Sequence, residues 1–365
     1  MKRNLIEFKA SYIKKKLSAM FMAVNRSTVL PILECCLIKV KDGVVTFLVS
    51  DLTTTIELFE KTDAVGDYSY CVNARQLLLF FNNAIEDDCR IYFQESHAFL
   101  ESGDFRVKLP TEPSEDFVIT PKCSTGDSVS FNTSELFPYL QIATRFTSSD
   151  NLRPAMTGVF LKSVSGVIEL AATDAHVLYS ESTKVKSGIR NCILENKSVK
   201  LILANMKEDT ATLQVDESNI YLSSESCRIT TRTIDAKYPD YTSIVQNAQH
   251  KLFFYLKRTH LVSFLKLAAA FVNKSTNQLV MNVSNKLISV SGGDCDFDID
   301  FSYKIPVMSP SNPFEDFKFA VNLSLLKKIL DAGKDEYVKI NHSTTPIAAI
   351  LIDGNFVLMP LLTNN

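Results

Sequence analysis

Apolar residues follow a β-strand pattern in three similar segments of this chain. Each segment has two stretches rich in Val, Leu and Ile on either side of a turn containing Gly or Asn, which predicts a β-hairpin. The segments span residues 33–51, 158–174 and 279–294. Each ends in an aspartate, and these residues, Asp51, Asp174 and Asp294, are separated by 123 and 120 residues. This spacing predicts a threefold internal repeat.

Apolar residues recur at helical spacing ahead of each hairpin. In the first repeat, Ile13, Leu17, Met20, Phe21 and Val24 form one apolar stripe on a helix. After each hairpin, a strand, a short helix and another strand are predicted near residues 70–93, 192–215 and 319–340. The six predicted helices span residues 11–24, 74–83, 134–146, 197–207, 258–272 and 324–331. Each repeat therefore has two helices and many strands.

Antiparallel strands with two segregated helices per repeat predict an α+β fold of three domains. The first two repeats end alike, in Pro113 to Phe117 and in Pro239 to Tyr241. A polar stretch follows each of these segments and is typical of a linker. We therefore predict domains at residues 1–123, 124–248 and 249–365.

The charge of the chain is unevenly distributed. The 365 residues are 46% hydrophobic and 22% charged, with a net charge of -2, which argues against a uniformly basic nucleic-acid binder. The six predicted helices nevertheless hold twelve Lys or Arg residues against only Glu135 and Asp331. If the helices share one side of the sheets, that side could meet phosphates without reading bases. The alternative is that these residues form ordinary solvated helix faces.

Cysteine usage and hydropathy predict a cytoplasmic protein without a membrane span. The eight cysteines contain no Cys-x-x-Cys pair, so we expect neither a zinc site nor a disulfide framework, but buried thiols. The apolar stretch at residues 17–24 is too short for a secretory signal. No segment reaches 18 uncharged apolar residues.

Four motifs, in order along the chain, resemble the bacterial sliding clamp family, the β subunit of DNA polymerase III. They are residues 26–33 (Arg-Ser-Thr-Val-Leu-Pro-Ile-Leu), 172–178 (Ala-Thr-Asp-Ala-His-Val-Leu), 238–241 (Tyr-Pro-Asp-Tyr) and 357–361 (Val-Leu-Met-Pro-Leu). The resemblance covers almost the whole chain and includes the threefold repeat. It implies three clamp-type domains with two helices each. It also implies a head-to-tail homodimer that closes around duplex DNA, without catalysis or a cofactor.

The resemblance also implies three sets of functional residues. A partner pocket would take apolar peptides from the DNA polymerase III α subunit, the clamp loader and other proteins carrying clamp-binding motifs, through Met156, Thr173, Ala175, His176, Val177, Leu178, Pro239, Ser243, Ile244, Val357, Leu358, Met359, Pro360 and Leu361. DNA contacts would come from Arg26, Arg153 and Lys197, with Lys14, Arg75 and Lys200 on the predicted helices as further candidates. The dimer interface would use Val107, Phe271 and Val272. Where many family members have Arg after the Pro-Asp-Tyr motif, this chain has Ser243, which affects peptide preference.

Two other function classes compete with this one. Asp174 and His176, with Asp51 and Asp294 at matching repeat positions, could suggest a metal-dependent nuclease. The repeat instead explains these aspartates as residues at strand ends. In addition, His176 has no partner histidine at ligand spacing. A scaffold of the same fold that binds only proteins is the other alternative, and a salt-dependent affinity for duplex DNA would distinguish it from a clamp.

Overall fold

The computed structural model describes residues 4–24, 30–118, 121, 123, 128–284, 287–311, 316–345 and 347–362. The chain forms two compact units. The first contains residues 1–141, 161–168 and 183–235, and the second contains residues 142–160, 169–182 and 236–365.

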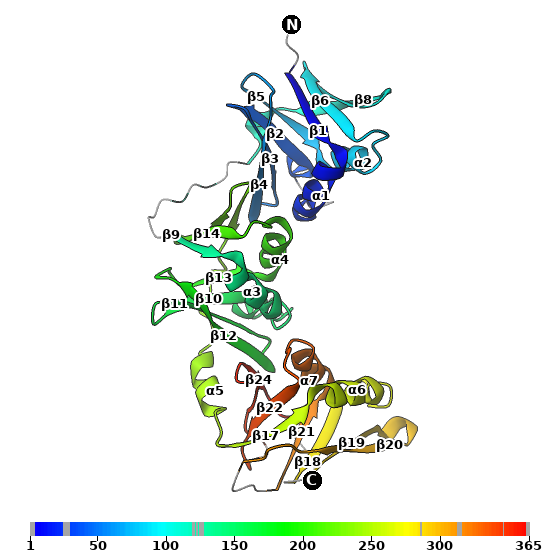
Figure 1. Ribbon diagram of the computed structural model, residues 1–365, viewed down its shortest axis with the longest axis vertical. Helices are drawn as coiled ribbons and strands as arrows, with labels where there is room; N and C mark the ends of the chain where they lie inside the picture. The colour runs from blue at the N-terminus through cyan, green and yellow to red at the C-terminus, as the bar shows by residue number, and fades with distance from the viewer. Residues whose placement is uncertain are drawn as a thin grey trace. The chain divides into compact units, whose positions relative to one another are not determined.

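Eight strands and two α-helices recur three times in the same order along the described chain (Figure 1). The helices of the three repeats are α1 (Ala10–Met20), α2 (Ala74–Asn82), α3 (Phe137–Ala143), α4 (Asn196–Asn205), α6 (Arg258–Ala268) and α7 (Leu323–Leu330). One further helix, α5 (Tyr241–Asn247), lies between the second and third repeats. The predicted α+β class and its repeat are therefore confirmed.

The first unit is built on a sheet of twelve strands. Their order is β1-β6-β7-β8-β5-β2-β3-β4-β16-β15-β14-β9. The strands are β1 (Asn4–Lys9), β2 (Cys35–Lys41), β3 (Val44–Ser50), β4 (Thr54–Lys61), β5 (Tyr68–Asn73), β6 (Asp88–Gln94), β7 (His97–Ser102), β8 (Phe105–Glu112), β9 (Ser128–Asn132), β14 (Thr210–Val215), β15 (Asn219–Ser223) and β16 (Cys227–Arg232). The first predicted hairpin is β2–β3, and its turn residues Asp42 and Gly43 have φ values of 50° and 73°. Such positive values are what a two-residue hairpin turn requires.

The remaining strands form two sheets. One has eight strands in the order β13-β10-β11-β12-β24-β23-β22-β17, and the other has four in the order β20-β19-β18-β21. The strands are β10 (Gly158–Val164), β11 (Val167–Thr173), β12 (Val177–Lys186), β13 (Cys192–Glu195), β17 (Leu252–Lys257), β18 (Gln278–Val283), β19 (Leu287–Asp294), β20 (Ile299–Pro306), β21 (Phe317–Asn322), β22 (Tyr337–His342), β23 (Ile350–Ile352) and β24 (Phe356–Leu358). All three predicted hairpin segments and all three predicted strand–helix–strand segments are therefore present.

Five of the six predicted helices are shorter than the sequence pattern predicts, and α7 has the predicted length. The first ends at Met20 and continues only as a 3-10 turn over Phe21–Ala23, although its stripe of Ile13, Leu17 and Met20 is fully buried as expected. The third covers Phe137–Ala143 and has Pro138 in its first turn, where the missing N–H costs little. Apolar periodicity continues past these helix ends because the following turns are also buried.

The polar stretch after Pro239-Asp240-Tyr241, predicted as a linker, lies between the second and third repeats, but it forms the helix α5 instead of an irregular segment. Asp240 caps that helix: its Oδ1 accepts hydrogen bonds from the backbone N–H groups of Thr242 at 3.1 Å and Ser243 at 3.4 Å. A helix of only seven residues has little stability of its own. Its two aromatic anchors, Tyr238 and Tyr241, are buried. Contacts with the rest of the unit therefore hold it.

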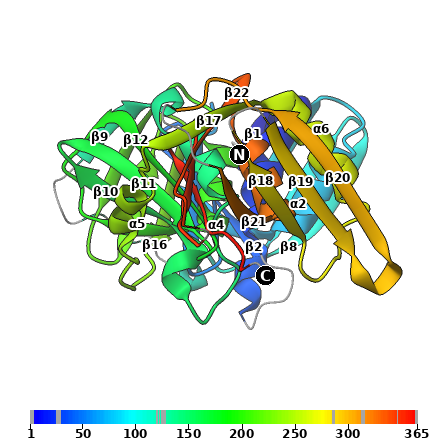
Figure 2. The same ribbon diagram turned by 90° about the horizontal axis from the view of Figure 1, so that it is seen from below.

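Strand pairing links the successive repeats. The strand after Asp51, β4, pairs with β16, the last strand of the second repeat, with Thr54 opposite Thr231. The strand after Asp174, β12, pairs in the same way with β24, the last strand of the third repeat, with Val177 opposite Leu358. The equivalent strand of the third repeat, β20, is the outermost strand of its sheet (Figure 2). Pairing of this kind between repeats therefore occurs twice, and the equivalent third strand, β20, lies at the edge of its sheet.

The last strand of the first repeat, β8, also has an unused edge. It pairs with β7 along Phe105–Pro110, whereas β5 reaches it only at Thr111 and Glu112. In the described chain, no strand pairs with the other side of residues 105–110. Unpaired strand edges are ready templates for another strand.

Six of the eight cysteines are buried, as predicted for free thiols, but Cys123 is only partly buried and Cys295 is exposed. All eight are free. Burial raises the pKa of Cys71 and of Cys192 to about 12, so these thiols stay protonated and unreactive at neutral pH. Along the described residues, no helix combines the length and apolar character needed to cross a bilayer.

Arg258 does not belong to the basic helix face on which its sequence position placed it. Its side chain is buried and pairs with Asp353 at 2.6 Å. It also donates to the carbonyl oxygens of Leu330 at 3.0 Å and Asp335 at 2.5 Å. This arginine joins α6 to the end of α7 and to the β23–β24 turn, so it cannot meet a phosphate.

His342 should make the stability of the protein pH-dependent. Its ring is buried and stacks on Phe317, with centroids 3.6 Å apart, and burial lowers its pKa from 6.5 to about 4. Between these pH values the unfolded chain binds a proton that the folded chain does not, so stability is lost as the pH falls through this window. We expect a loss of about 2 kcal/mol between pH 7 and pH 4.5.

Urea unfolding of wild type and His342→Phe at both pH values measures this effect. Phe keeps an aromatic ring in the stack but cannot titrate, so the variant should lose less stability on acidification. His260→Phe on the exposed face of α6 is the matched control and should behave like wild type. Equal acid sensitivity of wild type and His342→Phe would contradict the assignment.

Candidate functional sites

Three segments that are distant in sequence meet in the second unit. They are the corner between β11 and β12 (residues 173–178), the start of α5 (residues 239–244) and the C-terminal residues 357–361. The β12–β24 pairing places Leu178 opposite Val357, and the backbone N–H of Met359 donates to the carbonyl oxygen of His176 at 2.9 Å. Beyond this point the backbone N–H of Leu361 donates to the carbonyl oxygen of Ala320 at 2.7 Å.

Asp174 organises the corner. Its Oδ1 accepts from the backbone N–H groups of His176 at 3.0 Å and Val177 at 2.9 Å, while Oδ2 lies 3.3 Å from Lys328 Nζ. Ala175 completes the turn with a φ of 77°. The carboxylate is therefore occupied in holding the corner, which leaves His176 exposed beside it.

Two tyrosines dock α5 on the β10–β11 strands. The Tyr238 ring stacks on Phe160 with centroids 4.7 Å apart. The Tyr241 hydroxyl donates a hydrogen bond to the Glu169 carboxylate. Burial, followed by that hydrogen bond, raises the pKa of Tyr241 far above its usual range. The docked helix leaves Ser243 and Ile244 exposed.

Burial divides the predicted pocket residues into two groups. Thr173, Val177, Leu178, Val357 and Leu358 are buried. They therefore support the site rather than form its surface. The remaining residues are wholly or partly exposed, and these are Met156, Ala175, His176, Pro239, Ser243, Ile244, Met359, Pro360 and Leu361. Ile244 and Met359 are large apolar side chains with 41% and 39% of their surface exposed.

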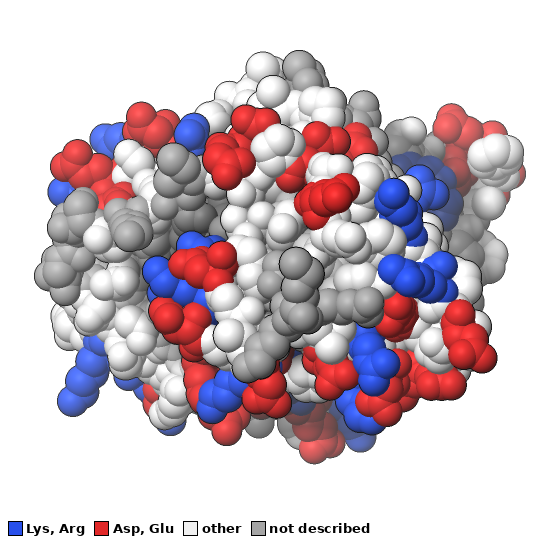
Figure 3. Space-filling model, turned by 90° about the horizontal axis from the view of Figure 1, so that it is seen from above, with Lys and Arg blue, Asp and Glu red and all other residues white. Residues whose placement is uncertain are grey.

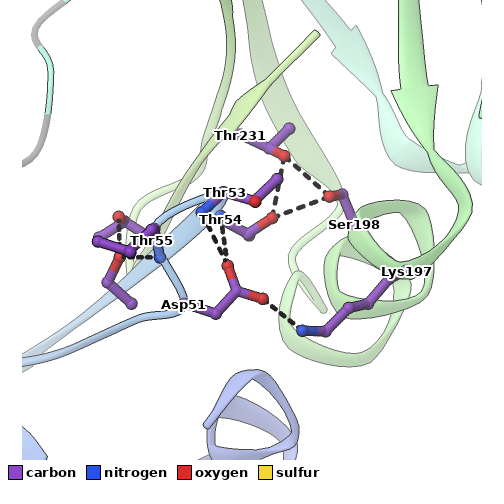
Figure 4. Close-up of polar contacts among 9 residues, drawn as sticks. Asp51, Thr53, Thr54, Thr55, Lys197, Ser198 and Thr231 are labelled. Atoms are coloured by element: carbon purple, nitrogen blue, oxygen red, sulfur yellow. Dashed lines mark hydrogen bonds and ion pairs between the residues drawn. The ribbon is translucent and has the colours of Figure 1, made fainter. Parts of the chain in front are cut away.

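A second polar cluster lies in the first unit, around Asp51 (Figure 4). Asp51 Oδ1 accepts from the backbone N–H groups of Thr53 at 3.0 Å and Thr54 at 2.7 Å. Its Oδ2 forms an ion pair with Lys197 Nζ. Lys197 is thus held by a carboxylate, which competes with any phosphate for this predicted DNA contact.

Three buried hydroxyls pack beside this ion pair. Thr54, Ser198 and Thr231 lie within 2.8–2.9 Å of one another and come from β4, α4 and β16. Each hydroxyl can donate once and accept twice, so the three can satisfy one another. The cluster joins the first repeat to the second (Figure 4).

The other predicted DNA contacts lie in varied surroundings. Arg26 is outside the described residues. Arg153 is exposed and pairs with Asp150 at 2.9 Å. Arg75 and Lys200 are exposed and Lys14 is half-buried. Within the described part of the chain, none of these last three side chains forms an ion pair.

Several helix cations are neutralised by acids from the strands. Lys16 pairs with Glu60 at 2.6 Å, in addition to the pairs of Lys197 and Lys328. Figure 3 shows one face of the molecule, on which basic and acidic side chains are interspersed. The strong helix charge counted from sequence is therefore reduced in the fold, and Lys14 on α1 and Lys200 on α4 are among the residues that keep it. These two helices are in contact, since Asn205 Nδ2 donates to the carbonyl oxygen of Ala19 at 3.2 Å.

The predicted interface residues differ in exposure. Val107 lines an apolar groove of about 490 Å³ between α2 and β8, together with Leu79, Phe80, Ile85 and Phe105. Phe271 is 44% exposed, just beyond α6. Val272 is 2% exposed, so it belongs to the core of its own domain and cannot contact a partner directly.

Among the residues that the structure describes, no group of three or more His, Cys, Asp or Glu side chains could hold a metal ion. Asp51 and Asp174 act as turn caps and ion-pair acceptors, as the repeat pattern predicts for strand-end residues.

Comparison with known families identifies the repeat. Residues 6–121 match the N-terminal domain of the DNA polymerase III beta subunit, and residues 135–240 match its central domain. This chain belongs to the DNA polymerase III beta subunit family. The sequence-based family assignment is therefore confirmed, and with it the expectation of a non-catalytic clamp protein.

Relatives in this family span nearly the same length. The beta sliding clamp of Chlamydia muridarum is 22% identical over 346 residues, which cover 93% of each chain. The sliding clamp of Bartonella birtlesii, solved with griselimycin bound, superposes with a TM-score of 0.91 at 20% identity, covering 99% of this chain and 100% of that one. The beta subunit of Thermotoga maritima superposes with a TM-score of 0.88 at 19% identity, covering 99% and 100%. These structures share the clamp fold.

Proposed function

We propose that this protein is a DNA sliding clamp that closes as a homodimer around duplex DNA and tethers the replicative polymerase to it. The observation that supports a closed ring is the repeated pairing of strands between successive repeats. Two pairings lie within one chain, and the edges of β20 and β8 remain for a third. A second copy supplies both missing edges, and a head-to-tail contact whose rotation closes makes a ring rather than a filament. Domains at residues 1–123, 124–248 and 249–365 are part of this proposal.

The helix count fits such a ring around a duplex. Leaving out α5, two copies would contribute twelve repeat helices, and a spacing of about 10 Å gives a circumference near 120 Å and an opening of roughly 28 Å. A B-form duplex about 20 Å wide passes this opening with room for water. A closed ring needs only weak, sequence-independent contacts, because topology retains it on the DNA.

The free cations of α1 and α4, Lys14 and Lys200, together with Arg153 and Arg26, are our proposed phosphate contacts. Contacts of this kind position a protein on DNA without reading its sequence. Lys197 is the weakest candidate, since a phosphate would have to displace Asp51 from it.

Partner proteins would bind the surface formed by residues 173–178, 239–244 and 357–361. Met and Ile side chains adapt to apolar anchors, and the polar atoms of His176 and Ser243 could fix the register of a peptide. A polymerase III α subunit or clamp loader bound there gains a high effective concentration at DNA. In agreement with a cytoplasmic location, most of the thiols are free and buried.

Reversing the two free helix cations should weaken retention on DNA. For Lys14→Glu with Lys200→Glu we expect about a tenfold shorter lifetime on nicked circular duplex DNA and a shallower salt dependence, because two phosphate contacts become repulsive. Size-exclusion chromatography of preloaded complexes measures the lifetime. Lys184→Glu with Lys186→Glu, on exposed positions of β12, is the matched control. Unchanged retention of the helix variant would count against a DNA-encircling function for this surface.

A further inference from the structure

Asp51 and Asp174, which end the hairpin segments of the first two repeats, make the same kinds of contact. Asp51 caps the turn that follows it and pairs with Lys197, the second residue of α4. Asp174 caps its own turn and pairs with Lys328 on α7. In both cases the cation comes from the second helix of the next repeat. Each pair therefore stands at a junction whose strands, β4–β16 and β12–β24, also pair.

Asp294 has the same position in the third repeat but a different set of partners. Its Oδ1 accepts from the backbone N–H of Asp296 at 3.1 Å and from Asn273 Nδ2 at 3.0 Å. The residue is only 8% exposed. Within the described chain, no Lys or Arg nitrogen is recorded in an ion pair with it. A carboxylate this buried is costly to keep charged unless a cation or further donors compensate it.

The repeat also indicates where the missing cation should come from. The next repeat after the third is the first repeat of a second copy, and its second helix is α2. Arg75 is the second residue of α2, the place that Lys197 has in α4. Lys328 is the sixth residue of α7, one helical turn further on and hence on the same face. Arg75 is exposed, and the described chain gives it no recorded acidic partner.

We propose that Arg75 of one copy pairs with Asp294 of a second copy and that these two residues position the ring-closing junction. The proposal rests on the homodimer proposed above and gives Arg75 a role in assembly instead of DNA contact. The apolar groove lined by Leu79 and Phe80 lies on the same helix as Arg75, so an ion pair there would flank an apolar contact. Unlike the other two pairs, this one would form only on association. It therefore contributes to specificity between copies as well as to affinity.

Charge exchange between two copies tests the pair. Arg75→Asp alone would place two aspartates at both junctions of its homodimer, and Asp294→Arg alone would place two arginines there. We expect the dimer dissociation constant of each variant to be at least about 100-fold higher than that of wild type, because each variant loses a buried charge pair. An equimolar mixture of the two variants forms a heterodimer with one wild-type pair and one exchanged pair, and it should recover wild-type association within about tenfold. Sedimentation velocity on the single variants and the mixture measures this.

Three further measurements keep the outcomes distinct. Asp294→Asn retains an oxygen acceptor for the turn and removes only the charge, so it should fold like wild type and still dimerise more weakly. Lys15→Asp and Glu225→Lys reverse exposed charges elsewhere and should leave association unchanged. A wild-type protein that is monomeric at every concentration would overturn the proposed homodimer. A wild-type dimer that tolerates Arg75→Asp, or a mixture that does not recover although circular dichroism shows both variants folded, would overturn this pair alone.

Discussion

A Phe271→Asp variant is expected to be monomeric at micromolar concentrations. Phe271 presents an exposed aromatic ring beyond α6, and the groove between α2 and β8 is the apolar surface that a second copy would offer it. Burying a Phe side chain contributes about 2–3 kcal/mol, and an aspartate in its place would also have to lose its hydration. Because a closed dimer contains the contact twice, the dimer dissociation constant should rise by about 10⁴-fold.

Small-angle X-ray scattering at several concentrations checks this result, since it reports both the mass and the hollowness of the particle. Leu152→Asp is the matched control: Leu152 is 92% exposed, and no proposed contact involves it. Val272→Asp would be a poor test, because a buried aspartate would unfold the domain. A Phe271→Asp dimer as tight as wild type would place the interface elsewhere.

The fold could be predicted from sequence because its signals are local. A hairpin needs only alternating apolar positions and a turn such as Asp42-Gly43, and each predicted strand–helix–strand segment is likewise continuous in sequence. The helix α5 was not predicted, although Tyr241, Ile244 and Val245 have the i, i+3, i+4 spacing of an apolar helix face, because seven residues are too few for this spacing to stand out from the polar residues around it. Asp240 followed by Tyr241 was the available signal, as an N-cap residue before a buried aromatic side chain.

The sites were harder to predict because they depend on contacts between distant segments. The pattern of residues 173–178 does not separate the buried Val177 from the exposed His176. Charge counting treated Lys197 and Lys328 as free cations, whereas their acidic partners are 146 and 154 residues away. Only the folded repeat shows that Asp51 and Asp174 are used alike and that Asp294 differs from them.

Peptide binding should be lost when an aspartate replaces either exposed apolar residue of the partner surface. Met359 and Ile244 come from the C-terminal segment and from α5, and each is about two-fifths exposed. An apolar peptide anchor packed against them would lose its contact and face a charge instead. For Met359→Asp and for Ile244→Asp we expect the affinity for a short apolar peptide of the polymerase III α subunit to fall by about 100-fold. Fluorescence polarisation of the labelled peptide measures this.

Point substitution tests the surface more cleanly than deletion of residues 359–362. Deletion would remove the backbone donors of Met359 and Leu361, which bond to His176 and Ala320, and so could loosen the C-terminal segment itself. Met359→Asp keeps those backbone bonds. Leu362→Asp is the control, because this residue is 78% exposed and its recorded contact uses only the carbonyl oxygen. Wild-type affinity in both Met359→Asp and Ile244→Asp would exclude this surface, whereas a loss in both with Leu362→Asp unchanged would locate the bound peptide between α5 and the C-terminal segment.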